Sequence, residues 1–67
     1  MSSRDDRVLR VLTRAARPMH VDELARYIGK RHGMDARRDM ALTSCRRLVE
    51  DGLAHETASG KFAVVGR

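Results

Sequence analysis

The chain has 67 residues, which predicts one small domain, and its single cysteine excludes an internal disulfide framework and fits a reducing compartment. No apolar run approaches the roughly 20 residues that cross a bilayer, and the opening MSSRDDR lacks the apolar core of a signal peptide, so we expect a cytoplasmic protein. The formal net charge of +5, with its excess of arginine, suits a polyanionic partner.

The first predicted element is a helix over residues 4–16. Ser3 is followed three positions later by Asp6, as in a capping box, and Asp5 lies beside it at the positive end of the helix dipole. Pro18 disfavours a helical conformation at the residue before it and ends the segment, so RPMH is expected to be a connection. The apolar positions recur with the spacing of one helical face: Val8, Leu9, Leu12, Ala15 and Ala16.

A second helix is predicted over residues 21–32. His20 is its expected cap, and Glu23 would be the third helical residue, in the first turn where an acidic side chain is favoured. The C-terminal boundary is open between Gly29 and Gly33, because the intervening KRH is compatible with either outcome. The apolar repeat consists of Val21, Leu24, Ala25 and Ile28.

The third predicted helix covers residues 36–51, with Asp35 as its N-cap and Gly52 as the left-handed residue that ends it. Residues placed 100° apart divide this helix into two faces. The first face is a narrow apolar stripe that would pack in the core, comprising Arg38, Ala41, Cys45, Leu48, Val49 and Gly52. The opposite face is broad and mostly polar, comprising Ala36, Met40, Thr43, Arg47 and Glu50.

Two short runs with strand-forming residues complete the chain, and they predict a hairpin over residues 53–65. LAHET and KFAVV are separated by ASG, in which Gly60 is free to adopt a positive φ. A two-stranded unit is marginal alone, so one face must lean on the helices. Alternation predicts Leu53, Phe62 and Val64 as the packed residues.

The succession PMHVDELARYIG, DARRDMALTSCRRLVEDGLA and HETASGKFAVV resembles the winged helix-turn-helix family, and the resemblance extends from Arg4 to Val65. It implies an α+β, mainly α fold in a single domain spanning residues 1–67. In that fold a three-helix helix-turn-helix core carries a C-terminal β-hairpin wing. It also implies double-stranded DNA binding, specific or general, by a small transcriptional regulator whose third helix enters the major groove. Such a protein would be associated with the nucleoid.

The resemblance places the DNA contacts on the third helix and the wing. Arg37 and Arg47 would contact guanine or phosphate, while Met40 would touch a thymine methyl group. The basic residues of the first helix and of KRH rank behind these, because the first helix normally lies behind the DNA-contacting pair in this family. The full set of expected DNA-binding residues is Arg37, Arg38, Met40, Thr43, Ser44, Arg47 and Lys61.

Other interpretations of the same pattern stay open. Twelve of the fourteen basic residues are arginine, which suits phosphate recognition but also follows from a GC-rich coding sequence. A winged helix can also be a protein interaction module without DNA contact. Exposure of the acidic residues of the third helix would favour that alternative: Asp35, Asp39, Glu50 and Asp51. A homodimer through the first helix or the wing edge would help a chain this small to bind specifically.

Catalytic and metal chemistry are not expected. His20, His32, His55 and Cys45 have no compact zinc spacing, and Cys45 falls on the predicted buried stripe. No glycine-rich phosphate loop follows a strand, and no nucleophile, base and orienting acid occur at a recognisable spacing. The sequence therefore predicts a binding protein without a cofactor or metal, and not an enzyme.

Overall fold

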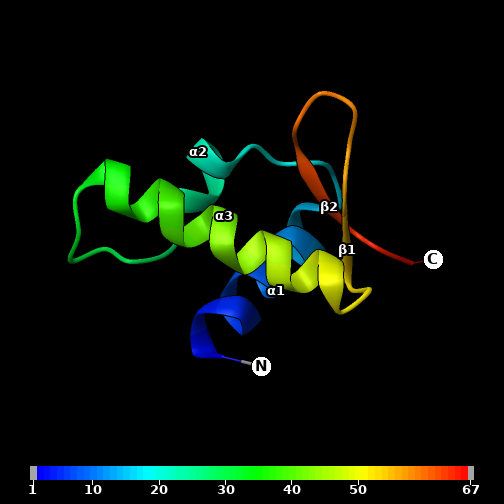
Figure 1. The fold of residues 1–67 in the computed structure, drawn as a ribbon, viewed down its shortest axis with the longest axis horizontal. Coiled ribbons are helices and arrows are strands. Elements are labelled where there is room, and N and C mark those ends of the chain that lie inside the picture. The colour runs from blue at the N-terminus through cyan, green and yellow to red at the C-terminus, as the bar shows by residue number, and fades with distance from the viewer. Residues whose placement is uncertain (1, 67) are drawn as a thin grey trace.

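The computed structural model of the chain describes residues 2–66, and within them three helices precede one antiparallel hairpin (Figure 1). The predicted fold class, α+β and mainly helical, is confirmed, and the order of the elements is consistent with a winged-helix layout. The elements are α1 (Ser3–Ala15), α2 (Val21–Ala25), α3 (Met34–Glu50), β1 (Ala54–Glu56) and β2 (Phe62–Val64).

Helix α1 begins one residue earlier than predicted. Its N-cap is Ser2, not Ser3, and the Ser2 hydroxyl accepts a hydrogen bond of 3.1 Å from the amide of Asp5. The helix ends at Ala15, because Ala16 adopts a left-handed conformation with a φ of 54° and donates its amide to the carbonyl of Leu12. The helix therefore stops before the residue that Pro18 restricts.

Helix α2 is much shorter than the predicted span of 21–32. Its predicted start is confirmed: the Nδ1 atom of His20 accepts from the Asp22 amide, and the Glu23 carboxylate accepts from the His20 amide at 3.0 Å. After Ala25 the chain forms a turn-rich segment, residues 26–33, which we call the connector. Gly29 ends any helical continuation, because its φ is +57°.

Helix α3 begins at Met34, so the predicted N-cap at Asp35 is wrong. Gly33 occupies the cap position without a side-chain hydrogen bond, and Asp35 lies in the first turn, where its charge still favours the helix dipole. The predicted end is confirmed within one residue, since α3 finishes at Glu50 and Gly52 has a φ of 76°. The result is a helix of 17 residues, the longest in the described chain.

The hairpin is tied to the helices by Met19, which lies in the stretch RPMH that the sequence predicts only as a connection. Within the hairpin, Ala54 pairs with Val64 and Glu56 pairs with Phe62. On the other side of β2, the amide and carbonyl of Met19 exchange hydrogen bonds of 2.8 and 2.9 Å with those of Phe62. Met19 thereby extends the sheet and fixes the hairpin beside the beginning of α2.

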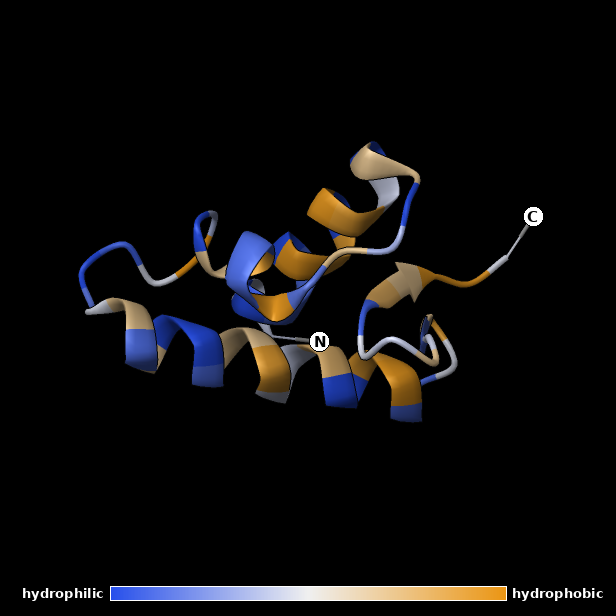
Figure 2. Cartoon of the chain, turned by 90° about the horizontal axis from the view of Figure 1, so that it is seen from above, coloured by the Kyte–Doolittle hydropathy of each residue, from blue (hydrophilic) through white to orange (hydrophobic). Residues whose placement is uncertain are grey.

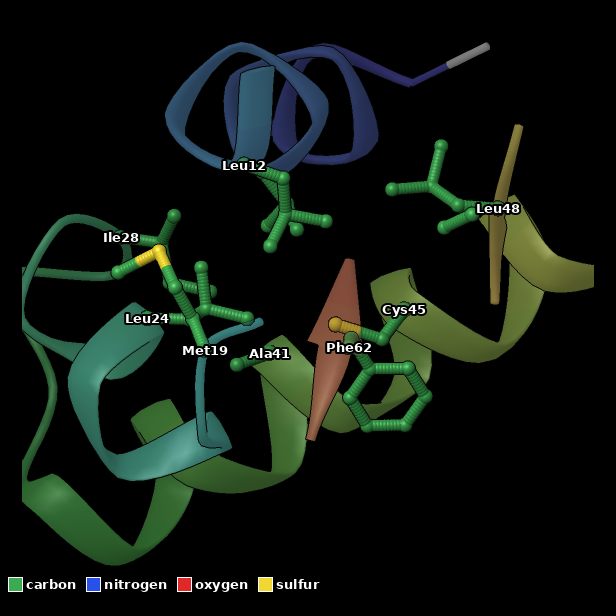
Figure 3. Packing of buried hydrophobic residues seen from close by; sticks show 10 residues of the cluster. Leu12, Met19, Leu24, Ile28, Ala41, Cys45, Leu48 and Phe62 are labelled. Carbon is green, nitrogen blue, oxygen red and sulfur yellow. The ribbon is translucent and has the colours of Figure 1, made fainter. Parts of the chain in front are cut away.

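The core gathers side chains from every element (Figure 3). Phe62 is buried as predicted and Val64 packs against the core, but Leu53 is 36 % exposed and Ala54 takes the buried position at the start of β1. Cys45 is buried, as predicted, and burial together with the charges of Asp5 and Glu56 raises its pKa to about 12. The buried cluster contains Val8, Leu12, Met19, Leu24, Ile28, Ala41, Cys45, Leu48, Ala54 and Phe62.

Hydrophilic and hydrophobic residues alternate along α3, which lies along one side of the molecule (Figure 2). No helix in residues 2–66 is long and apolar enough to cross a membrane.

Candidate nucleic-acid interface

Helix α3 lies along one side of the molecule, and one of its surfaces is left uncovered by the other elements (Figure 2). We call this surface the outer face. Its central residues are all exposed, and they carry both signs of charge: Asp35, Ala36, Asp39, Thr43, Arg46 and Glu50. Of the predicted DNA contacts, Thr43 alone lies at the centre of this face.

Arg37 and Met40 lie on the flank of α3 that packs against the connector. Both are half-buried, and Met40 contacts the core instead of pointing outward as the helical wheel predicted. The Nε atom of Arg37 donates a hydrogen bond of 3.0 Å to the carbonyl of Ile28. A Cβ atom at Gly29 would lie 2.7 Å from the sulfur of Met40, so this flank is in close contact with the connector.

Arg38 lies on the opposite flank, where its charge is already shared by two carboxylates. It forms ion pairs with Asp35 and, at 3.5 Å, with Asp22 at the start of α2. Lys61 is exposed on the hairpin. Lys61 directly precedes Phe62, which pairs with Met19, so its charge lies near the start of α2. The pKa of Glu23, in the first turn of α2, is lowered mainly by the His20 amide and then by Arg17, with a weaker contribution from Lys61.

The prediction that Ser44 lies on or beside the exposed surface is wrong. Its exposed fraction is 0 %, and its hydroxyl has no hydrogen-bond partner within residues 2–66. The reason is helical phase: Ser44 comes three residues after Ala41 and four before Leu48, both of which are fully buried. Ser44 faces the interior and cannot reach a ligand on the outer face.

Arg47 is half-exposed, but its guanidinium is held by a carboxylate from α1. Its Nη1 atom donates to Asp5 at 3.4 Å, and Asp5 is only 4 % exposed. Burial by itself raises the pKa of Asp5, but the nearby hydroxyls of Ser44 and Ser2 and the charge of Arg47 outweigh it, so the pKa lies below its ordinary value of 3.8. This contact fixes the N-terminal end of α1 against α3.

Asp5→Asn is expected to lower the free energy of unfolding at neutral pH by about 1–3 kcal/mol, because it removes a buried charge-assisted contact. A lowered folded pKa means that the carboxylate stabilises the fold above pH 3.8 and that this contribution is lost as the pH falls through the folded pKa. The difference between variant and wild type should therefore shrink in acid. Urea unfolding at neutral pH and well below pH 3.8 measures both effects.

The control for this variant is Asp39→Asn, which removes an exposed carboxylate from α3. Surface substitutions of this kind change stability by about 0.5 kcal/mol or less. An Asp5→Asn loss no larger than that of Asp39→Asn would show that the contact with Arg47 does not stabilise the fold.

The acidic residues of α3 and its C-cap are exposed together, while three of the arginines hold internal partners. Asp35, Asp39, Glu50 and Asp51 are all exposed. Arg37 donates to the carbonyl of Ile28, and Arg47 donates to the carboxylate of Asp5. Arg38 forms ion pairs with two carboxylates. Among the ion pairs of the described residues none involves Arg46, so its positive charge on the outer face is unneutralised.

A second group of basic residues gathers around the connector, and the sequence ranks these residues behind those of the third helix as candidates for DNA contact. We call Arg4, Arg7, Lys30 and Arg31 the connector cluster. Arg4 and Arg7 share one side of α1 at a spacing of three, and Lys30 and Arg31 are adjacent in KRH. Each pair can be recognised in the sequence. That the two pairs lie close together in space cannot, because 23 positions separate Arg7 from Lys30.

No protein-family model, curated protein or solved structure matches this chain. The resemblance to winged helices therefore depends on the order and spacing of the chain's own elements. Within the described part of the chain, no three His, Cys, Asp or Glu side chains are grouped so that they could hold a metal ion.

Proposed function

We propose that the protein binds double-stranded DNA as a small transcriptional regulator, with α3 in the major groove. The observation that carries the proposal is that α3 is uncovered along its outer face, in a chain with helix, helix, helix and hairpin in that order (Figure 2). Its 17 residues span about 25 Å, and the major groove of B-DNA, about 12 Å wide, admits a helix of this kind. The net charge of +5 supports association with a polyanion.

The exposed residues of α3 divide into two roles in this proposal. Thr43 and Arg46 on the outer face would meet base edges, and an arginine can bond guanine through two hydrogen bonds. Arg47, half-exposed beside Asp5, and Lys61 on the hairpin would meet phosphates on the flanks. Arg37 would contribute its charge while its Nε atom holds the connector.

A second candidate function is supported by the exposed carboxylates of the outer face. Asp39 and Glu50 lie along the centre of the surface that would meet DNA, and no ion pair within residues 2–66 neutralises them. Negative charge at a phosphate-lined groove costs affinity unless it is paired. The same carboxylates would favour a basic segment of a partner protein, which is the interaction-module alternative.

The proposal is tested by titrating wild-type protein into a labelled random-sequence duplex and following fluorescence anisotropy at about 50 and about 200 mM salt. If four phosphates are contacted, affinity should fall roughly 100-fold between the two conditions. The variant Thr43→Ala/Arg46→Gln should bind several-fold more weakly near 50 mM salt and lower the salt slope by about 0.9, because a random duplex is bound mainly through charge and the variant loses one positive charge from the outer face. Thermal unfolding of the variant verifies its fold.

The matched control is Thr13→Ala/Arg14→Gln, which makes the same two changes at exposed positions of α1. Its binding should stay within about twofold of wild type, because non-contacting surface charge acts weakly. Asp39→Asn/Glu50→Gln should strengthen DNA binding by removing repulsion. Absence of wild-type binding at the lower salt would overturn the DNA proposal, and the protein-docking candidate would then take its place.

A further inference from the structure

We propose that the connector cluster is a phosphate-binding site that holds one backbone of the DNA while α3 lies in the adjoining major groove. This inference rests on the proposed function and deepens it, because it assigns the electrostatic part of binding to residues outside α3. Its members are Arg4 and Arg7 from α1 and Lys30 and Arg31 from the connector.

Two adjoining hollows bring these side chains together. The first, of about 310 Å³, is lined by Arg7, Tyr27, Gly29, Lys30, Arg31 and His32. The second, of about 270 Å³, is lined by Ser3, Arg4, Arg7, Ile28 and Gly29. Arg7 and Gly29 line both hollows, so the two form one continuous surface. No carboxylate lines either of them, and four positive charges therefore surround a region without a neutralising group.

The charge of the cluster is available to a ligand. The ion pairs of the described chain involve Arg10, Arg17, Arg38, Arg47 and His20, and none involves a cluster residue. Arg7 donates from Nη1 to the carbonyl of Tyr27 at a long 3.4 Å. That contact keeps the guanidinium beside the connector and leaves its other N–H groups for a phosphate, which arginine binds through paired hydrogen bonds.

The connector backbone adds donors to the same surface. Gly29 adopts a φ of +57°, and its carbonyl accepts the amide of His32 at 2.8 Å, which closes a tight turn around Lys30 and Arg31. The hydrogen bonds within residues 2–66 do not use the amides of Lys30 and Arg31. Consecutive free amides next to a left-handed residue are a common way for a backbone to bind an anion.

The cluster lies on a definite flank of α3. The Arg37 bond to Ile28 and the Arg47 bond to Asp5 place the connector and the beginning of α1 on the same flank. The Arg38 pair with Asp22 defines the opposite flank, where Lys61 also contributes charge. A groove occupied by α3 is bordered by a phosphate backbone on each side. The connector cluster would meet one backbone, and Lys61 would meet the other.

The test uses the same random-sequence duplex and compares three double variants of equal charge. Lys30→Gln/Arg31→Gln and Arg4→Gln/Arg7→Gln each remove two cluster charges, and Arg10→Gln/Arg14→Gln removes two charges elsewhere on α1. Each cluster variant should bind at least tenfold more weakly near 50 mM salt and reduce the salt slope by about 2, because each lost phosphate contact removes about 0.9. The α1 control should keep the wild-type slope within about half a unit.

A second readout locates the contact directly. In a two-dimensional amide NMR titration with the duplex, the resonances of Lys30 and Arg31 should shift in wild type, and they should shift less on the Arg4→Gln/Arg7→Gln background at equal protein and DNA concentrations. Thermal unfolding of each variant verifies that the connector still packs on α3.

The two proposals fail differently in these experiments. If wild type binds no DNA at the lower salt, the proposed function fails and this inference falls with it. If wild type binds and Thr43→Ala/Arg46→Gln weakens it, but the cluster variants match the Arg10→Gln/Arg14→Gln control, then DNA binding stands and the cluster is overturned. Equal weakening by all three charge variants would mean that net charge alone drives association, which also overturns the cluster.

Discussion

Phe62→Ala is expected to lower the free energy of unfolding by about 3–5 kcal/mol, because a buried aromatic side chain is replaced by a cavity. Phe62 is the largest fully buried side chain of the described residues, and it comes from the strand that Met19 ties to the helices. A chain of 67 residues has a total stability of about 3–10 kcal/mol. The substitution should therefore leave much of the protein unfolded, which urea titration followed by circular dichroism will measure.

Leu53→Ala is the control for this prediction, since Leu53 belongs to the same hairpin and is 36 % exposed. It should cost about 1–2 kcal/mol, clearly less than Phe62→Ala, because the leucine side chain is smaller and more than a third of its surface already lies in water. Equal losses in the two variants would show that the hairpin does not pack on the core in the register described, with Glu56 opposite Phe62.

The hairpin shows what the alternation of apolar and polar residues in a sequence can predict and what it cannot. The pattern correctly predicts two short strands and a turn with Gly60 at a φ of 81°. It fails to place Leu53 because a strand of three residues has too few positions to establish which alternate set faces inward. The residue that does face inward is Ala54, whose small side chain gives almost no hydrophobic signal.

The second helix shows a related limit. Its start was predictable, because the His20 cap and Glu23 act within four residues of each other. Its length was not, since Ile28 continues the apolar repeat and is buried, but it reaches the core from a turn after Ala25. Burial of one side chain does not require helical backbone when the core approaches a turn closely.

The candidate site was the least predictable part, because its electrostatics depend on pairs that are distant in the chain. Arg38 meets Asp22 across 16 positions and Arg47 meets Asp5 across 42. Each pair neutralises an arginine that the family resemblance places at DNA. Besides Arg46, positive charge without an ion pair gathers where α1 and the connector meet, and this meeting depends on residues distant in the chain.

This distribution gives the domain two chemically different surfaces, one on α3 and one beside it. The outer face mixes Arg46 with carboxylates and suits selective contacts, whereas the connector cluster has no carboxylate and suits phosphate. In protein–DNA complexes, phosphate contacts position a protein and base contacts select the sequence. A division of these two roles between separate surfaces would let a domain of 67 residues bind tightly with few base contacts.

Leu48→Ala is expected to destabilise the protein by about 2–5 kcal/mol, a loss comparable to its whole stability. Leu48 is fully buried and belongs to the core cluster near the end of α3, one residue after Arg47. Its side chain points toward the interior between α3 and the other elements (Figure 3). Thermal and urea unfolding measure the change. A large loss would confirm that Leu48 faces the core and therefore that the outer face of α3 is the exposed one.

The neighbouring residue supplies the sharpest control. Helical phase in the sequence places both Leu48 and Val49 on the buried stripe, but Val49 is 38 % exposed. Val49→Ala should therefore cost less than Leu48→Ala, about 1 kcal/mol, because more than a third of the Val49 surface already lies in water and its side chain is smaller. If Val49→Ala is the more damaging of the two, α3 is rotated toward Val49, and Thr43 and Arg46 no longer lie at the centre of its exposed side. Stability measurements on two adjacent residues thus establish which face of α3 is exposed before any DNA is added.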